Sequence, residues 1–493
     1  MGQKASGNAG KERIELIRGL GLLDGTMIIA GSMIGSGIFI VAADIAKAMP
    51  SPGLLLLTWV LTGVMTMAAA LSYGELSAAM PHAGGQYVYL REAYGPLCGF
   101  LYGWTLFLVI QTGTIAAVAV AFARYLDVFL PLSRVLFSLD LAGRHFTLDL
   151  KQLVGVAVIL ILSFTNCFGI RVGARVQNLF TFLKIAALLA LILVGLSFAS
   201  GSRGHFFPLW PDSASLSSLV EPFRRSGASL FTFHSAGMDL VLIFGVAMIG
   251  ALFSSDAWNN LTFIGGEVKN PKRTLPLALF LGTGLVTLLY LMTNVAYLYV
   301  LPLDQISGSE RIAAKAAQTI LGPLGSGLVS LAILISTFGC LNGIILSGPR
   351  VYFAMARDGL FFRGLAAIHP RSHAPVRSLL VQAVWASLLT LSGTYSQLLT
   401  YVISAALLFY ILTVWGVLRL RKKRPELERP YQAFGYPFLP VIYVMMAAIV
   451  LGCNLVGDPA NSWPGFILIL IGLPAYFYWK RKYGFQPFSD EVD

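Results

Sequence analysis

Charged residues are scarce in this sequence: aspartate, glutamate, lysine and arginine together make up 12% of its 493 residues. Soluble globular domains carry about 25% charged residues. With 56% apolar residues and a mean hydropathy of +0.75, the composition excludes an ordinary soluble fold. What remains is a series of long apolar runs separated by short polar loops, which is typical of helices that cross a bilayer. The sequence therefore predicts an all-α polytopic membrane protein.

Cysteine and histidine are also rare, with four and six residues respectively. The cysteines stand singly in or beside apolar runs, at Cys98, Cys167, Cys340 and Cys453. That spacing fits neither a metal site nor a disulfide framework, so we expect free thiols packed as small hydrophobes. The histidines all fall in loops or at the ends of apolar runs. An intramembrane enzyme would need a metal cluster or a nucleophile beside its base. We therefore expect no enzymatic activity, no metal and no cofactor.

The net charge of +12 would suit a protein that binds nucleic acid. However, the basic residues gather in short loops between the apolar runs, and membrane topology explains that pattern more simply. The strongest markers are the basic residues of 419–424 and 480–482, which can also bind acidic lipid head groups. We expect a multi-pass protein of the plasma membrane with both termini in the cytoplasm, with the lipid bilayer and no nucleic acid among its partners.

Apolar runs of about 20 residues number about twelve. They cover 22–48, 54–80, 97–130, 153–168, 176–198, 238–266, 275–300, 324–355, 379–391, 398–418, 438–456 and 466–479. Between the runs we expect a short surface helix that ends at Tyr94, a short helix near 217–223 and an amphipathic helix around 310–319. The expected segments are a cytoplasmic segment 1–21, a core 22–419, a basic loop 420–436, a final helix pair 437–481 and a cytoplasmic tail 482–493.

The first apolar run carries glycine and serine in its middle, where a lipid-facing helix would carry leucine. These residues are Gly31, Ser32, Gly35, Ser36 and Gly37. Each glycine in a helix interior costs roughly 0.5 to 1 kcal/mol relative to alanine, so this cluster favours local unwinding. Unwound backbone at membrane depth is tolerated only beside protein or a watery cavity. The alternative is close helix packing over small residues, because Gly31 and Gly35 have small-xxx-small spacing.

The sixth apolar run is interrupted as well, by the small and polar residues of 253–260. It becomes the counterpart of the first run if a first repeat, about 22–200, recurs upside down as a second repeat, about 238–419. Two interrupted helices at corresponding positions of two halves are typical of the substrate site of a secondary transporter. The pair of interruptions therefore favours a functional break in the first run over simple close packing.

Lys184 lies about 15 Å into the fifth apolar run at 1.5 Å per residue. An ionisable residue at that depth is a candidate functional group, because its charge needs partners inside the protein. We expect its ammonium to meet unwound carbonyls of the first run, near Gly31, together with Ser336 or Thr337 of the eighth run. It would then replace a bound sodium ion or carry protons. The alternative is a lysine that merely stands near the end of a run.

Several groups of residues form a familiar set when taken together. They are Gly35–Phe39, Tyr73–Leu76 with Gly84–Tyr89, Gly103–Trp104, Phe253–Asn259 with Glu267 and Asn270–Pro271, and Gly339–Gly343 with Ser347–Arg350. This set resembles the amino acid-polyamine-organocation superfamily, and most of all its L-type amino acid transporter branch and bacterial homologues. The resemblance extends from about residue 19 to residue 480. It implies a LeuT-type fold of five-plus-five inverted repeats with two further helices, twelve in all.

The same resemblance implies a substrate site at the two interruptions. The substrate carboxylate would lie on backbone amides, its ammonium on the carbonyls of Met33, Phe253 and Asp256, and Phe253 with Trp258 would form a gate. The implied substrate-binding set is Met33, Ile34, Gly35, Ser36, Gly37, Phe253, Ser254 and Asp256. Lys184, with Gly31, Ser336 and Thr337, would stand in the place of a sodium ion, and Tyr87 and Glu267 would flank the cytoplasmic path.

Two features depart from the animal members of that family. Asp256 stands where those members often have glycine, and it either caps the second half of the sixth run or adds a charge that favours a cationic substrate. The loop 131–150 contains no cysteine, so we expect no disulfide-linked heavy chain.

The expected function is sodium-independent transport of small or medium neutral L-amino acids by exchange, with alternating access. A proton-coupled importer, an exchanger of cationic amino acids or amines, and a non-transporting amino acid sensor remain as alternatives. A channel is disfavoured, because the sequence shows no filter repeats or pore-lining rings.

Overall fold

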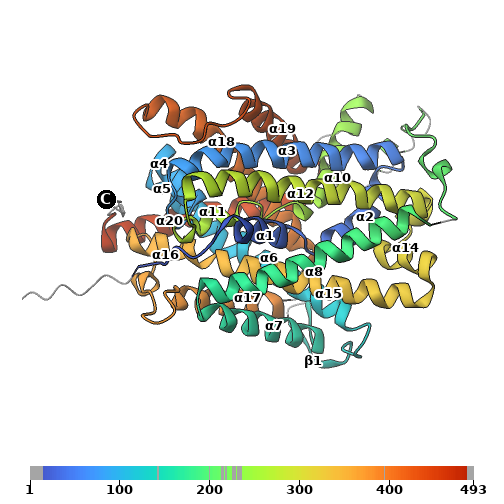
Figure 1. Cartoon of the computed structure of the whole chain (residues 1–493), viewed down its shortest axis with the longest axis horizontal. Coiled ribbons are helices and arrows are strands. Elements are labelled where there is room, and N and C mark those ends of the chain that lie inside the picture. The colour runs from blue at the N-terminus through green and yellow to red at the C-terminus, as the bar shows by residue number, and fades with distance from the viewer. Residues whose placement is uncertain are drawn as a thin grey trace, which may run out of the picture.

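The computed structural model describes residues 15–141, 144–198, 200–212, 236–392 and 395–485, with a few single residues between 213 and 235. Most of these residues are helical, and the long helices run beside one another in a bundle (Figure 1). Ten helices of the described part are long and apolar enough to cross a membrane, and two shorter apolar helices cover Leu22–Met33 and Val376–Leu391. The predicted helical, polytopic membrane protein is confirmed. The count of twelve spans and the inverted repeat stay predictions.

In the first half of the bundle, most of the helices predicted there are present, and their boundaries differ from the predicted ones by a few residues. Its elements are α1 (Leu22–Met33), η1 (Gly37–Phe39), α2 (Val41–Ala48), α3 (Pro52–Ala79), α4 (Gln86–Tyr94), α5 (Pro96–Thr105), η2 (Leu106–Ile110), α6 (Gln111–Leu126), α7 (Leu150–Cys167) and α8 (Ile170–Leu196). An antiparallel hairpin, β1 (Val135–Leu141) and β2 (Arg144–Asp149), lies between α6 and α7 and was not predicted.

The helices predicted in the second half are also mostly present, with boundaries that differ by a few residues from the predicted ones. Its elements are η3 (Arg203–Phe206), α10 (Ala236–Ser254), α11 (Asn260–Phe263), η4 (Gly265–Glu267), α12 (Pro271–Val300), α13 (Leu303–Ser307), α14 (Ile312–Leu321), α15 (Pro323–Ser347), α16 (Pro349–Arg357), η5 (Arg363–Ala366), α17 (Val376–Leu391), α18 (Tyr395–Lys423), α19 (Phe438–Gly457) and α20 (Pro459–Tyr483). Of the helix expected near 217–223, residues 219–221 and 223 are described, and these are helical.

Local signals at the helix starts explain several of these boundaries. The Ser51 hydroxyl accepts the N–H of Leu54 at 3.3 Å, and Pro52 occupies the first turn of α3, where its missing N–H costs nothing. Asp149 and Gln152 form a capping box at the start of α7, with both bonds at 3.0 Å. These short polar signals mark the starts of helices that are mostly apolar.

Burial separates central helices from peripheral ones. In the most apolar window of 96–126, 83% of residues are buried, whereas only 28% are buried in the corresponding window of α8. Large apolar side chains on the outer face of α8, such as Phe182 and Leu193, are exposed. Because lipid chains are as apolar as these side chains, such faces suit the hydrocarbon of a bilayer. The inner face of α8, by contrast, carries the buried residues Gln177, Thr181 and Lys184.

The helix α4 is buried, so the predicted surface helix ending at Tyr94 is wrong in its placement. Gln86, Tyr87 and Tyr89 are each at most 1% exposed. The N–H of Gly84 donates to the carbonyl of Phe263 at 2.9 Å, and a Cβ at Gly85, whose φ is +43°, would lie 2.6 Å from the backbone of Thr262. The glycine pair thus lets the start of α4 lie directly against α11.

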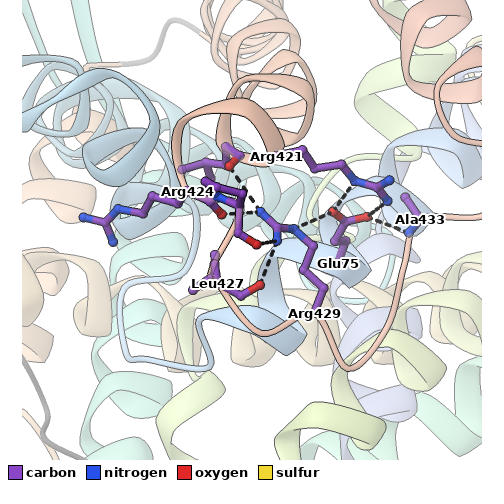
Figure 2. Close-up of polar contacts among 8 residues, drawn as sticks. Glu75, Arg421, Arg424, Leu427, Arg429 and Ala433 are labelled. Carbon is purple, nitrogen blue, oxygen red and sulfur yellow. Dashed lines mark hydrogen bonds and ion pairs between the residues drawn. The ribbon is translucent and has the colours of Figure 1, made fainter.

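A charged cluster joins α3 to the segment after α18. We call Glu75, Arg421, Arg429 and Ala433 the Glu75 cluster. The Glu75 carboxylate accepts the Nε and Nη2 of Arg421 at 2.9 and 2.7 Å and the N–H of Ala433 at 2.7 Å (Figure 2). Arg429 approaches the same carboxylate at 3.6 Å, and its other nitrogens donate to backbone carbonyls of the loop.

Other residues of the basic run 419–424 bind protein groups as well. Arg419 donates to the carbonyl of Ala93 at 2.8 Å, and Arg424 pairs with Glu92 at 2.7 Å. Both partners lie on α4. The basic run therefore links α18 to α3 and α4.

Candidate functional site

The first apolar run is broken after Met33. Ile34 ends α1 in an extended conformation with ψ of 93°, and the helix resumes as the single turn η1 before α2. Among the described residues, the backbone N–H groups of Gly35, Ser36 and Gly37 donate to no acceptor. Three neighbouring buried amides without partners are the kind of arrangement that can accept an anion.

The glycines of this segment also allow close packing. A Cβ at Gly37 would overlap the Ser254 hydroxyl and lie 2.8 Å from the Cβ of Ser254, and a Cβ at Gly31 would overlap Gln177 and Thr181. The two interpretations of the glycine cluster, a broken helix and a close helix contact, are therefore both present, at neighbouring positions.

The second interruption separates α10, which ends at Ser254, from α11, which begins at Asn260. Ala257, between them, has a φ of +66°, which is rare for a residue with a side chain. The hydroxyl of Tyr290 on α12 lies 3.0 Å from the carbonyl oxygens of both Met33 and Ser254, as a donor. Tyr290 thus ties the two interruptions together. Sequence analysis missed it, although a tyrosine within an apolar run was the available signal.

Lys184 is 1% exposed and its ammonium meets three backbone carbonyls. Its Nζ donates to the carbonyl oxygens of Gly31, Ile34 and Ser336, each at 2.8 Å. The ammonium thereby joins α8 to the end of α1 and to α15, and three oxygens meet its three protons.

Of the two residues expected from the eighth run, only one takes part. The Ser336 hydroxyl donates to the carbonyls of Ile34 and Gly35 at 3.1 Å, whereas its carbonyl binds Lys184. Ser336 thus meets the expectation of Ser336 or Thr337, and the Thr337 hydroxyl instead donates to the carbonyl of Ile333 at 2.8 Å, on its own helix. A threonine in a helix commonly bonds the carbonyl four residues back, which turns its hydroxyl away from neighbouring helices.

A narrow cavity lies between the two interruptions. It is lined by Ser32, Met33, Gly35, Ser36, Gly37, Thr114, Val118, Phe253, Ser254, Asp256, Ala257, Cys340 and Ile344. We call it the first cavity. Phe253 thus lies at the cavity, whereas Trp258 packs away from it, with its ring 4.6 Å from that of Tyr73 and 5.4 Å from that of Tyr410. Of the two predicted gate residues, only Phe253 touches the first cavity.

Asp256 does not cap the second half of the sixth run. The residue that precedes α11 is Asn259, and the carboxylate of Asp256 instead accepts the hydroxyl of Tyr410 at 2.6 Å. The extra turn between Ala257 and Asn259 moves the helix start away from Asp256. Asp256 borders the first cavity and two neighbouring ones. The capping interpretation is therefore wrong, and the carboxylate faces the site.

The two residues predicted at the cytoplasmic path, Glu267 and Tyr87, lie in separate buried networks. Glu267 pairs with Arg350 through bonds of 2.7 and 3.0 Å, and both side chains are at most 1% exposed. The Tyr87 hydroxyl donates to Asp358 at 2.6 Å, and Arg91 pairs with the same carboxylate. Burial, together with the Asp358 charge, raises the pKa of Tyr87 well above its usual range, so the hydroxyl stays a neutral donor. Sequence analysis did not identify Arg350 or Asp358 as partners.

The chain matches the family model of amino acid permeases over residues 20–474. The chain belongs to the amino acid permease family. This permease is thus a member of the superfamily that its motifs resemble, and the matched residues include both interruptions and Lys184.

Named relatives agree with that assignment. The permease is 31% identical to the Large neutral amino acids transporter small subunit 2 of Mus musculus, over 97% of this chain and 85% of the relative. It is 32% identical to the Asc-type amino acid transporter 1 of Mus musculus, over 96% of this chain and 83% of the relative. It is 29% identical to the Cystine/glutamate transporter of Homo sapiens, over 96% and 88%. The permease is therefore a membrane transport protein of the L-type branch and not an enzyme.

Proposed function

We propose that this permease exchanges small or medium neutral L-amino acids across the plasma membrane, without sodium, by alternating access. The observation that carries the proposal is the row of unpartnered amides at Gly35, Ser36 and Gly37 beside the first cavity. A carboxylate is the part common to all amino acids, and neighbouring N–H groups at a helix break bind it well. The relative named as a transporter of large neutral amino acids supports a neutral substrate, and the Asc-type relative is named as an amino acid transporter.

The ammonium of the substrate would meet backbone carbonyls at the opposite side of the first cavity. The carbonyl of Met33 already accepts from Tyr290, and that of Phe253 from the N–H of Asp256 at 3.1 Å. Because a carbonyl oxygen has two lone pairs, each keeps one for a further donor. A zwitterion held only through its two charged ends would leave its side chain to decide affinity.

The position of Lys184 supports independence from sodium. Its ammonium occupies a nest of three carbonyl oxygens, which is the kind of coordination that a sodium ion would otherwise take. A fixed cation holds the broken segment against α15 throughout the cycle and needs no ion from solution.

We further propose twelve spans, with two inverted repeats of five and both termini in the cytoplasm. One of the three relatives reported above is named as a small subunit, which indicates a partner for that protein. In this chain the described cysteines are all free, and the loop 131–150 has none. We propose that this permease works without a disulfide-linked heavy chain.

Counterflow in proteoliposomes tests the proposal. Vesicles loaded with one neutral L-amino acid should take up a second, labelled one, with equal rates in sodium and in choline buffers. Uptake into empty vesicles should be slow. A sodium requirement would overturn the role of Lys184, and equal uptake by empty and loaded vesicles would exclude obligatory exchange.

Asp256 favours one second candidate, the exchange of cationic amino acids or amines. Its carboxylate faces the cavities and caps no helix, so it is available to a positive side chain. Competition by L-lysine and L-alanine, in the native protein and in Asp256→Gly, separates the candidates. If L-lysine competes in the native protein and loses this ability in the variant, the cationic substrate class is correct.

A further inference from the structure

A second cavity adjoins the first one. It is narrow in this structure and shares Thr114, Asp256, Ala257 and Ile344 with the lining of the first cavity. Asn259 lines the second cavity but not the first. A substrate whose charged ends lie in the first cavity would reach the second with its side chain. Asn259 thus stands at the side-chain end of the site.

A chain of three buried side chains runs from Asn259 through Gln86 to Thr413 on α18. The Nδ2 of Asn259 donates to the Oε1 of Gln86 at 2.8 Å, and the Nε2 of Gln86 donates to the hydroxyl of Thr413 at 3.0 Å. The Thr413 hydroxyl donates in turn to the carbonyl of Phe409 at 2.7 Å. The side chains of Gln86, Asn259 and Thr413 are each at most 2% exposed. Gln86 is therefore the middle of a hydrogen-bonded chain that begins in the second interruption.

The direction of every bond in this chain follows from its far end. The Thr413 hydroxyl has a single proton, and Phe409 accepts it, so Thr413 can only accept from Gln86. The amide of Gln86 must then present its oxygen to Asn259. A reversed Asn259 amide would place oxygen against oxygen, which leaves two buried acceptors unpaired. The chain therefore selects one orientation of the Asn259 amide.

The placement of α4 makes this possible. Gly84 and Gly85 hold the start of α4 directly against α11, as described above, and Tyr94 at its other end donates to the carbonyl of Leu412 on α18 at 2.7 Å. The helix that carries Gln86, α4, is thus held by α11 at its start and by α18 at its end. A helix exposed at the protein surface could not place Gln86 between Asn259 and Thr413.

We propose that Gln86 is a positioning residue for substrate selection. It holds the Asn259 amide in one orientation at the side-chain end of the site and anchors it to α18. The inference rests on the proposed exchange of neutral amino acids and adds which part of the substrate is selected. A polar substrate side chain long enough to enter the second cavity would depend on Gln86 through the Asn259 amide. A methyl side chain would not.

Exchange kinetics of Gln86→Leu with two labelled substrates test this inference. The KM for L-glutamine, whose side chain is long and polar, should rise about five-fold, as expected for loss of one neutral hydrogen bond. The KM for L-alanine and both kcat values should change less than two-fold. In an Asn259→Ala background, Gln86→Leu should have no further effect on the L-glutamine KM, because the group that it positions is gone.

Gln382→Leu is the matched control. Gln382 is an equally buried amide that donates to the carbonyl of Ile345 at 3.2 Å and makes no bond to Asn259. Its effect should be the same in the native and Asn259→Ala backgrounds. If Gln86→Leu yields no folded protein, Thr413→Val removes the anchor instead and should raise the L-glutamine KM selectively.

The outcomes separate the two proposals. Equal shifts for L-glutamine and L-alanine, or additive effects of the Gln86 and Asn259 variants, would overturn the role of Gln86 while exchange itself stands. A native protein that exchanges L-alanine but not L-glutamine would also overturn it. A native protein that exchanges neither removes the proposed function, and this inference falls with it.

Discussion

Two regions of the protein are both buried and polar: the Glu75 cluster, and the break between α1 and η1. They differ in whether their polar groups have hydrogen-bond partners. In the Glu75 cluster, the carboxylate accepts three hydrogen bonds of 2.7 to 2.9 Å from Arg421 and Ala433. At the break, the amides of Gly35, Ser36 and Gly37 have no acceptor among the described residues. An unpaired buried polar group costs about 1 to 3 kcal/mol, so a fold keeps several together only where a ligand completes them. We therefore expect the Glu75 cluster to be structural and the break to bind a ligand.

Lys184→Met should have the largest effect, because it leaves three buried carbonyl oxygens without their cation. Breaking a buried charged arrangement typically costs about 3 to 5 kcal/mol, which predicts a loss of exchange of at least about 100-fold. Initial rates of counterflow measure it. Lys47→Met is the control, since Lys47 is exposed and pairs only with Asp44 at 3.5 Å. Exchange by Lys184→Met within a few-fold of the native rate would show that the carbonyls need no cation.

Gly37→Ala should come next, because it closes the contact between the two interruptions. The added methyl would lie 2.8 Å from the Cβ and 3.1 Å from the Cα of Ser254. We expect exchange to fall about 10- to 100-fold, from about 1 to 3 kcal/mol of overpacking strain. Gly37→Ala/Ser254→Gly should recover part of that loss in the same assay, since the Cβ of Ser254 is removed.

The matched glycine for this experiment is Gly452 on α19. A Cβ at Gly452 meets nothing within 4 Å, so Gly452→Ala should leave exchange unchanged. If Gly37→Ala exchanges normally, the two interruptions do not need their close contact, and the comparison with the Glu75 cluster loses its basis.

Glu75→Gln should lower stability and leave substrate binding intact. The variant removes the charge that Arg421 and Arg429 share, and we expect a loss of about 1 to 3 kcal/mol. A thermal melt of the detergent-purified protein should show a lower Tm, with the KM for L-alanine unchanged. A changed KM at native Tm would assign the cluster to transport and contradict its structural role.

Glu428→Gln should have the smallest effect of the series. Glu428 pairs with Lys272 at 2.6 Å, but its side chain is 73% exposed. Exposed ion pairs contribute about 0 to 1 kcal/mol, so the Tm should stay within about 1 °C of the native value. A Tm shift as large as that of Glu75→Gln would mean that pairing, rather than burial, decides which charges stabilise this protein.

Most of the fold could be predicted from residue patterns. The apolar runs, the glycine cluster and the interruption at 253–260 led to the helices and to both breaks, and α1 and α10 end where those patterns change. The predictions failed where contacts with residues distant in sequence determine whether a helix is buried. Gln86 looks like part of a surface helix until α11 and α18 cover it.

The sequence by itself determined the membrane setting, the helical class and the places where helices break. Those properties depend on local composition, because each helix in lipid must satisfy its own backbone. Only the tertiary structure decided which groups meet: Tyr290 with both interruptions, Lys184 with three carbonyls, and Gln86 with Asn259. Such contacts join residues up to 257 positions apart, and hydrogen-bond geometry over such separations is set by helix packing.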